Sequence, residues 1–293
     1  MKYTFMKNHG EEFSMERMSF VFQVSRSGYY RFIRGKSSMR SMENIRLLEE
    51  IKVIHDANRQ VYGSPRIHAE LGLQGETCSR KRVARIMRTA GLHAKMKRRF
   101  KVTTQVDLLA QKAPNLLQQD FSAEQPNQRW VADITYVATA EGWLYVAAIL
   151  DLFSRRIVGL VMNERITADL VINALKQAMA QRQPSDGLIH HSDKGIQYTS
   201  SAFQKLLASN NMICSMSGTG NCYDNAAMES FFHTLKTEHI YFESYKTRDQ
   251  AKQSIFEYVE VFYNRKRSHS TLGYLSPLIF ETKWQEQQNC LAS

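Results

Sequence analysis

Two aspartates and one glutamate stand out in the second half of the sequence because of where they lie. Asp133 interrupts an apolar stretch, and Asp193 ends a second one. A carboxylate among apolar side chains costs several kcal/mol or more without a counter-ion. Glu229 follows a turn-forming segment and lies near the start of an expected helix, where the helix dipole tolerates negative charge. The two aspartates therefore demand a positive partner, and Glu229 is placed to share it.

The spacing of these acids suits a metal site. Residues 134–192 separate the two aspartates, and residues 194–228 separate Asp193 from Glu229. If the first and fourth strands of the domain are neighbours, Asp133 and Asp193 project to one point and Glu229 closes the cluster. Hard carboxylate oxygens prefer Mg²⁺ or Mn²⁺. Two such ions can activate a water or a 3′-hydroxyl and stabilise the leaving oxygen of a phosphodiester displacement. We therefore expect two Mg²⁺ ions, with Mn²⁺ as the alternative.

Two further charged residues lie where they could take part in the same chemistry. Asp151 ends the second expected strand, and we interpret it as a turn residue that orients its neighbours. Lys236 follows Glu229 by seven residues, and helical spacing puts both on one face with His233. From that face Lys236 can reach a DNA phosphate near the metal ions, and a solvated surface lysine is the alternative.

The elements that position these acids indicate an α/β domain. After Arg129 the sequence changes from helical patterns to strand patterns, and then alternates strands with amphipathic helices. This element order is typical of a ribonuclease-H-like fold, so we expect a mixed five-stranded sheet flanked by helices. The expected strands are 130–137, 143–150, 156–162, 188–191 and 213–216, and the expected helices are 167–181, 200–209 and one that starts at 225.

The excess positive charge lies in the first 120 residues. They hold 23 Lys and Arg against 11 Asp and Glu, whereas residues 121–293 hold 16 against 17. Cations concentrated in one segment attract a polyanion, because each neutralised phosphate releases counter-ions. This segment also has three expected helices in a helix-turn-helix pattern. They span 43–55, 64–73 with Ser64 as its cap, and 79–90 with Ser79 as its cap and Gly91 just past its end.

The last of these helices is the expected DNA reader. Val83, Ile86 and Met87 form its inward stripe and leave the basic side chains for solvent or phosphate. Such a helix suits a major groove, although a solvated charged face is the alternative. The predicted DNA-binding residues are Arg80, Lys81, Arg82, Arg85 and Arg88 in this helix, Lys97, Arg98 and Arg99 just beyond it, and Lys236.

Composition, periodicity and the positions of proline residues divide the chain into five expected segments. The segment 102–126 lacks a clean period and contains Pro114 and Pro126, which favours a linker. The α-helical helix-turn-helix region precedes the linker and the catalytic core follows it. The segments are 1–40, small, helical and compatible with a helix-turn-helix; 41–101, the DNA-binding domain; 102–126, the linker; 127–285, the core; and 286–293, a tail.

Several segments resemble the DDE transposases of bacterial two-frame insertion sequences, whose catalytic domain is related to retroviral integrase. Three of them surround the acids, at 130–136, 191–198 and 222–232. The same family is matched by 59–73, by Tyr263-Asn264-Arg265 with His269, and by Leu272-Gly273 with Pro277.

This resemblance implies a function and a site. Asp133, Asp193 and Glu229 would be the metal-binding catalytic triad, and Lys236 the family's basic position. The implied reaction is cleavage and joining of insertion-sequence ends in double-stranded DNA, by a homo-oligomer, with water or a 3′-hydroxyl as nucleophile. Family members are the second reading frame, joined by frameshifting to an upstream helix-turn-helix and leucine-zipper protein, which is the further partner expected. The family context also places His191 facing DNA or behind the metal ligands.

Two other functions stay open from the sequence. A non-catalytic DNA-binding regulator of the element needs only the basic N-terminal half. A ribonuclease-H-like nuclease that cuts without joining would use the same metal ions. No stretch approaches the roughly 20 apolar residues of a membrane span, and the N-terminus has no secretory apolar block. We therefore expect a cytoplasmic, nucleoid-associated protein with no membrane partner.

Overall fold

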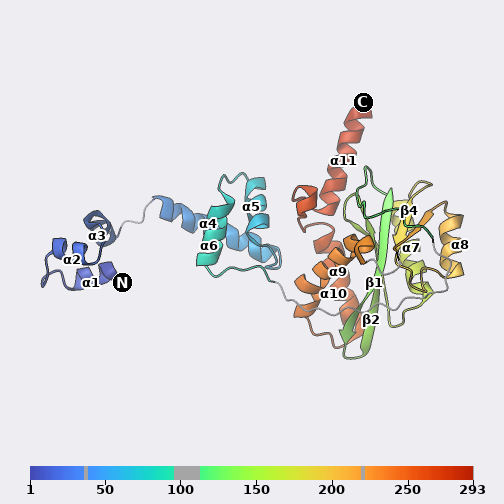
Figure 1. Cartoon of the computed structure of the whole chain (residues 1–293), viewed down its shortest axis with the longest axis horizontal. Helices are drawn as coiled ribbons and strands as arrows, with labels where there is room; N and C mark the ends of the chain where they lie inside the picture. Colours follow the sequence, from blue (N-terminus) through green and yellow to red (C-terminus); the bar gives the residue numbers. More distant parts are fainter. Residues whose placement is uncertain (36–38, 96–112, 219–221, 293) are drawn as a thin grey trace.

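The computed structural model describes residues 1–35, 39–95, 113–218 and 222–292. Along the chain, a small group of short helices is followed by a three-helix unit and then by a sheet domain (Figure 1). The first group consists of α1 (Lys2–Asn8), α2 (Met15–Val21) and α3 (Arg26–Ile33). These helices lie in the segment 1–40 that was expected to be helical, and α1 packs Met6 against Met18 and Tyr29.

The three-helix unit contains α4 (Met39–Ala57), α5 (Ser64–Leu73) and α6 (Arg80–Thr89). Ser79 caps α6 by accepting a hydrogen bond from the backbone N–H of Arg82, as predicted. The predicted cap of α5 is wrong. Gly63 occupies the cap position without a side-chain bond, and Ser64 is already helical, because Pro65 fits the first turn of a helix.

The three-helix unit is joined to the sheet domain by polar contacts from α5 and the turn before it. Arg59 Nη2 lies 2.6 Å from Glu257 Oε1, and its guanidinium lies over the Tyr258 ring. Tyr62 is fully buried, and its hydroxyl accepts a hydrogen bond of 2.7 Å from the backbone N–H of Ser268. The buried apolar side chains of the two units also form one continuous cluster.

The sheet domain has five strands in the order β3-β2-β1-β4-β5. β1 pairs with β2 and β2 with β3 in antiparallel fashion, whereas β1 with β4 and β4 with β5 are parallel. The predicted fold class, a mixed five-stranded sheet flanked by helices and preceded by a helical region, is confirmed. The strands are β1 (Arg129–Thr139), β2 (Gly142–Asp151), β3 (Ile157–Asn163), β4 (Ile189–Ser192) and β5 (Ile213–Met216).

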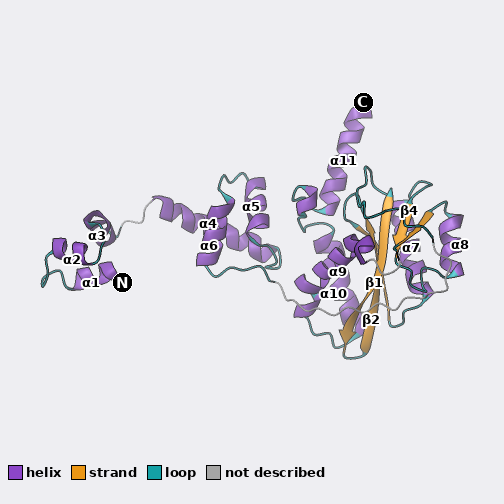
Figure 2. Cartoon of the chain, in the orientation of Figure 1, coloured by secondary structure: helices purple, strands orange, loops and turns teal. Residues whose placement is uncertain are grey.

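Helices cover both faces of this sheet (Figure 2). One face packs against α7 (Ala168–Arg182) and α8 (Ser201–Ser209). The approach of α7 is close, because a side chain at Gly159 of β3 would meet the backbone oxygen of Ala174 at 2.6 Å. The other face packs against α9 (Ala226–Glu238) and α10 (Arg248–Phe256), which continues as the π-helical turn η3 (Glu257–Tyr263).

The C-terminal segment is tied to the sheet domain by buried polar side chains. Asn264 accepts a hydrogen bond from the backbone N–H of Ile157 and donates one to its carbonyl oxygen. In α11 (Pro277–Ala292), Glu281 accepts hydrogen bonds from Ser154, Arg156 and Arg182. These guanidinium and hydroxyl partners keep the pKa of the Glu281 carboxyl below its usual range despite burial.

Both outer edges of the sheet are partly covered. On β3, the backbone N–H of Leu160 donates to the side chain of Gln177. On β5, Met216 N–H donates to the carbonyl oxygen of Pro114, and Ser215 Oγ accepts from the N–H of Leu116. The described part of the expected linker, from 113 onward, therefore packs along the sheet domain.

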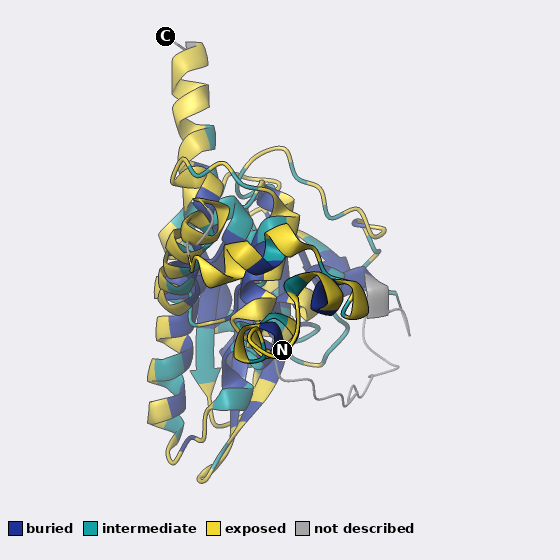
Figure 3. Ribbon diagram, turned by 90° about the vertical axis from the view of Figure 1, so that its left-hand side faces the viewer, coloured by how far each residue is buried: buried dark blue, intermediate teal, exposed yellow. Residues whose placement is uncertain are grey.

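Burial is concentrated in the sheet and the helices against it, while the end of α11 projects outward (Figure 3). α11 also runs across the expected boundary between core and tail at 285. Among the helices in the described ranges, none has the length and apolar character needed to cross a membrane.

Candidate active site

Asp133 and Asp193 lie side by side because of the register of two parallel strands. Val131 of β1 pairs with His191 of β4. Each aspartate follows its paired residue by two positions, so the two carboxylates leave neighbouring strands, spaced about 4.8 Å apart, on the same face. On β1 that face carries Val131 and Val137, which pack in the cluster beneath α9. The structure thus brings together the two aspartates that the sequence singled out.

Each of these carboxylates uses one oxygen for a backbone hydrogen bond. Asp133 Oδ1 accepts from the N–H of Ile134 at 2.7 Å, and Asp193 Oδ1 accepts from the N–H of Gly195 at 2.9 Å. Gly195 suits this loop because a side chain there would approach Asp193 Oδ1 to 2.9 Å. The second oxygen of each carboxylate has no hydrogen-bond donor among the described residues.

The two carboxylates are held in an environment that disfavours their charge. Burial and, to a smaller extent, the neighbouring negative charge of Asp193 together raise the pKa of Asp133 to about 7. The Ile134 N–H and the Lys236 ammonium act in the opposite direction. Burial also raises the pKa of Asp193, against the hydrogen bond from Gly195. Burial and mutual repulsion therefore favour protonation of this pair, which a nearby cation would oppose.

Glu229 is placed near the pair but is less tightly associated with it. It lies in the first turn of α9, as predicted, and its side chain is exposed. Its charge raises the pKa of Asp133 by less than that of Asp193 does, and partial burial raises its own pKa. The start of α9 is fixed to β1 because Asn225 Nδ2 donates to the carbonyl oxygen of Ala132.

Lys236 lies on the same side of α9 as Glu229, two turns later, and is half-buried. Its ammonium group lies 5.2 Å from the ring centroid of Tyr136 and interacts favourably with Asp133. Burial lowers its pKa. The structure thus brings a cation to the carboxylates, where it can neutralise a carboxylate or a phosphate.

The donor set fits a divalent metal ion. Asp133 and Asp193 each offer one carboxylate oxygen to which no described residue donates a hydrogen bond, and hard cations prefer such ligands. Within the described ranges, no three Asp, Glu, His or Cys side chains are already grouped closely enough to hold a metal. The two aspartates are therefore already placed to bind a metal ion, whereas the Glu229 carboxylate would have to move closer to them to become a third ligand.

Tyr198, the last residue of the segment 191–198, is a further residue of the site to which the sequence assigned no role. It is 2% exposed, and its hydroxyl lies in the field of both Asp133 and Asp193. Burial and these two carboxylates raise its pKa well above the ordinary value. Its position five residues after Asp193 was the only signal in the sequence.

The two histidines of β4 are buried on opposite faces of the strand. His191 uses both ring nitrogens, at 2.8 Å from Ser215 Oγ and 3.2 Å from Ser217 Oγ, so it braces β4 against β5. Burial lowers the pKa of His191 to about 4 and that of His190 to about 3. His190 packs against Phe203, and its ring nitrogens have no hydrogen-bond partner in the described structure.

Asp151 serves the strand turn, as its position suggested. It is fully buried, and its carboxylate accepts hydrogen bonds from the backbone N–H groups of Asn127 and Phe153. Arg182 lies 3.5 Å from it. Burial raises the pKa of Asp151 to about 6 against these partners.

The predicted DNA-binding residues of α6 divide into two kinds. Arg82 is engaged within its own unit, with Asn44 Oδ1 and Glu43 Oε2 each at 2.8 Å. The others are exposed, and Val83, Ile86 and Met87 behind them are buried as predicted. Lys97, Arg98 and Arg99 lie outside the described residues. The exposed residues are Arg80, Lys81, Arg85 and Arg88.

Adjacent carboxylates on parallel central strands, beneath a helix with a further acid and a lysine, define an integrase-like polynucleotidyl transferase core. Family comparisons agree with this class. An integrase core domain family matches residues 123–222, a second integrase core domain family matches 229–284, and an HTH-like domain family matches 43–100.

Two curated relatives match along nearly their whole length. An uncharacterized 31 kDa protein of insertion element IS600 from Shigella sonnei is 46% identical over 266 residues, which cover 91% of this chain and 98% of the relative. Transposase InsF for insertion sequence IS3A from Escherichia coli is 42% identical over 288 residues, which cover 97% and 99%. The chain therefore belongs to the IS3-type family of insertion-sequence transposases, and it is the second-reading-frame, DDE-type member that the resemblance implied.

Solved structures with a similar arrangement include retroviral integrases. A chain of a simian T-cell lymphotropic virus intasome aligns with a TM-score of 0.47 and 17% identity, covering 79% of this chain and 74% of that one. The catalytic core domain of HTLV-2 integrase, solved in complex with magnesium, aligns with a TM-score of 0.44 and 16% identity, covering 55% and 99%.

Proposed function

We propose that this transposase cleaves the ends of its insertion sequence and joins them to target DNA by in-line phosphodiester transesterification. Asp133, Asp193 and Glu229 would hold Mg²⁺, with two ions as the expected number. The main observation in support is the register of β1 and β4, which puts Asp133 of β1 beside Asp193, the first residue after β4. Burial raises the pKa of both carboxyl groups, and a divalent cation bound between them would offset the cost of keeping them ionised.

The chain's own residues would position the reacting groups. A bound divalent cation supplies Lewis acidity and charge neutralisation to a phosphodiester under in-line attack. The N–H groups of Ile134 and Gly195 fix the orientation of the two aspartates, so that their second oxygens stay directed to the site. Lys236 holds a positive charge next to Asp133, where it can bind a phosphate oxygen. Catalysis of this kind is chiefly positioning and neutralisation of charge.

We also propose the partners and the division of the chain. The exposed cations of α6 would bind double-stranded DNA at the element ends, in the segment 41–101, and the core 127–285 would carry the chemistry. The segment 1–40 would be a separate small helical unit, 102–126 the connection and 286–293 a tail. A homo-oligomer would assemble on DNA at the nucleoid, with the upstream helix-turn-helix and leucine-zipper frame as a fusion partner.

The test is the variant Asp193→Asn in the full chain. Losing one of two adjacent carboxylates should lower Mg²⁺-dependent joining of element-end DNA by at least about 100-fold. DNA affinity measured in EDTA should change by no more than about twofold, because the exposed contacts are untouched.

The matched control is Asp249→Asn, because the Asp249 side chain is 83% exposed and, among the residues that the structure describes, pairs only with Lys252. It should join DNA at the wild-type rate. Joining by Asp193→Asn at a rate within about threefold of this control would refute the proposed mechanism.

A further inference from the structure

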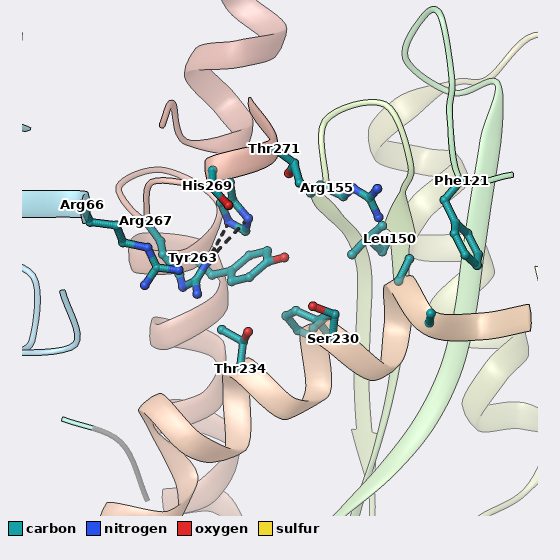
Figure 4. A pocket seen from close by; sticks show the side chains of 14 residues that line it. Arg66, Phe121, Leu150, Arg155, Ser230, Thr234, Tyr263, Arg267, His269 and Thr271 are labelled. Atoms are coloured by element: carbon teal, nitrogen blue, oxygen red, sulfur yellow. Dashed lines mark hydrogen bonds between the residues drawn. The ribbon is translucent and has the colours of Figure 1, made fainter. Parts of the chain in front are cut away.

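A second polar site lies on the flank of α9 next to the carboxylates. A cavity of about 370 Å³ opens between α9, the turn after β2 and the segment after η3. We call it the α9 pocket. Arg66 and Arg267 lie on one side of it and Arg155 on the other (Figure 4). Hydroxyl groups are supplied by Ser230, Thr234, Tyr263, Ser270 and Thr271, and no Asp or Glu is among the described residues that line the pocket.

Arg155 is the unusual member of this set. Its side chain is half-buried, yet among the described residues its guanidinium has no ion pair and no side-chain hydrogen bond. Burial lowers the pKa of Arg155, and the Tyr263 hydroxyl acts in the opposite direction. Its backbone has φ of +61°, a conformation that costs a non-glycine residue about 1 kcal/mol or more. A half-buried arginine that is held by a strained turn without a partner is expected to have an anionic ligand.

The other two arginines leave the α9 pocket with excess positive charge. Arg267 forms two hydrogen bonds of 2.7 Å with the Glu238 carboxylate, and Arg66 lies 3.3 Å from the same carboxylate. One negative charge therefore balances two guanidinium groups, and Arg155 is additional. Burial first, and then these three cations, lower the pKa of His269 well below its ordinary value, so the ring is neutral.

The pocket is well placed for a strand that passes the carboxylates. Ser230 lines it and directly follows Glu229 in α9, so the two side chains leave the helix on adjacent faces. A helix with its side chains is about 10 Å across, and nucleotides along one strand rise about 3.4 Å each, so a few nucleotides span the two sites. Guanidinium groups bind phosphate by paired N–H donors, which hydroxyls supplement.

We propose that the α9 pocket binds a backbone phosphate of DNA, with Arg155 as its main ligand and the surrounding hydroxyls as further donors. The pocket holds DNA and takes no part in the metal chemistry, so its test does not depend on the role of Asp193. The pocket also draws Arg66 from α5, and the binding of one phosphate would therefore connect the three-helix unit to the core.

The experiment measures binding of the full chain to a mixed-sequence DNA duplex in EDTA across a range of salt concentrations. Arg155→Gln should weaken binding about fivefold at low salt and reduce the slope of log affinity against log salt by about 0.7–0.9, the value for one phosphate. The matched control is Arg165→Gln, because Arg165 is 80% exposed and lies 3.8 Å from Glu164. Equal affinity and slope in the two variants would overturn the proposal.

A second arm separates DNA from a free anion. Inorganic phosphate should raise the melting temperature of the wild type but not that of Arg155→Gln. Stabilisation through Arg155 by phosphate, combined with unchanged DNA binding, would show a free-anion site and also overturn the proposal.

If Arg155→Gln does not fold, an exposed lining residue replaces it. Thr271→Glu would place a negative charge at the pocket mouth and should weaken DNA binding at least as much. Its control is Thr282→Glu on the exposed side of α11. Equal binding by these two variants would count against the pocket in the same way.

Discussion

Helix α6 and the carboxylate pair of β1 and β4 present charge in opposite ways. α6 exposes four cations to solvent, where each contributes little to the stability of the fold and its charge is screened by salt. The core holds Asp133 and Asp193 half-buried and adjacent, where burial and repulsion shift the pKa of Asp133 to about 7. In the roles proposed above, DNA binding would be distributed over several exposed side chains, whereas the chemistry would depend on a few adjacent carboxylates.

The largest expected effect tests the cost of the buried charge. The folded-state pKa of Asp133, about 7, lies above its unfolded value near 3.8, so the folded state binds the proton more strongly. The contribution of this proton to the free energy of unfolding is complete below about pH 4 and is lost as the pH rises through about 7. In EDTA, Asp133→Asn should therefore have a higher free energy of unfolding than the wild type, and this gap should be about 2–3 kcal/mol larger at pH 8 than at pH 5.

Urea unfolding at the two pH values measures this gap. Asp249→Asn serves as the exposed control and should show a constant difference from the wild type. A gap for Asp133→Asn that stays constant with pH would mean that the core carboxylates behave like the exposed charges, which removes the contrast between the two regions.

A smaller effect is expected at Lys236, which belongs to both kinds of charge. Lys236→Gln should lower the rate of strand joining about tenfold, because a cation next to Asp133 is lost from the site. Affinity for DNA should fall by no more than about threefold, because only one of several phosphate contacts is lost. The control is His233→Gln, one turn earlier on the same face of α9 and exposed. Equal loss of affinity and rate in Lys236→Gln would place Lys236 with the binding residues instead.

The smallest effects separate two arginines on α6. Arg85→Ala should weaken DNA binding about threefold, with a shallower salt dependence and unchanged stability. Arg82→Ala should lower the free energy of unfolding by about 1 kcal/mol, because Arg82 loses Asn44 and Glu43. Binding titrations and thermal melts of both variants measure these effects. Reversed outcomes would show that exposure does not decide which cations of α6 contact DNA.

Much of the site could be predicted because its signals are local. Apolar runs that end or break at Asp133 and Asp193 mark strands, and their order places the two strands together. The inward stripe of α6 follows from helical spacing alone. The prediction of the α5 cap was wrong because Ser64 and Gly63 both suit that position. The backbone conformation decides which of the two stays outside the helix, and here it is Gly63.

The remaining features depend on contacts between distant parts of the chain. The engagement of Arg82 with Asn44 and Glu43 requires the packing of α4 against α6, which spacing does not specify. The α9 pocket joins Arg66, Arg155 and Ser230 from three separate elements. Its residues carry no shared pattern in the sequence, so only the fold reveals them.

The covered edges of the sheet have a consequence for assembly. Side-chain amides of Asn264 and Gln177 occupy backbone groups of β3, and the chain from Pro114 to Leu116 lies along β5. Edge strands with open backbone groups recruit other chains and aggregate. A second copy of this protein is thus discouraged from pairing with either edge of the sheet. Copies that assemble on DNA as proposed would contact one another through helices and loops, and such contacts are more easily reversed than a shared sheet.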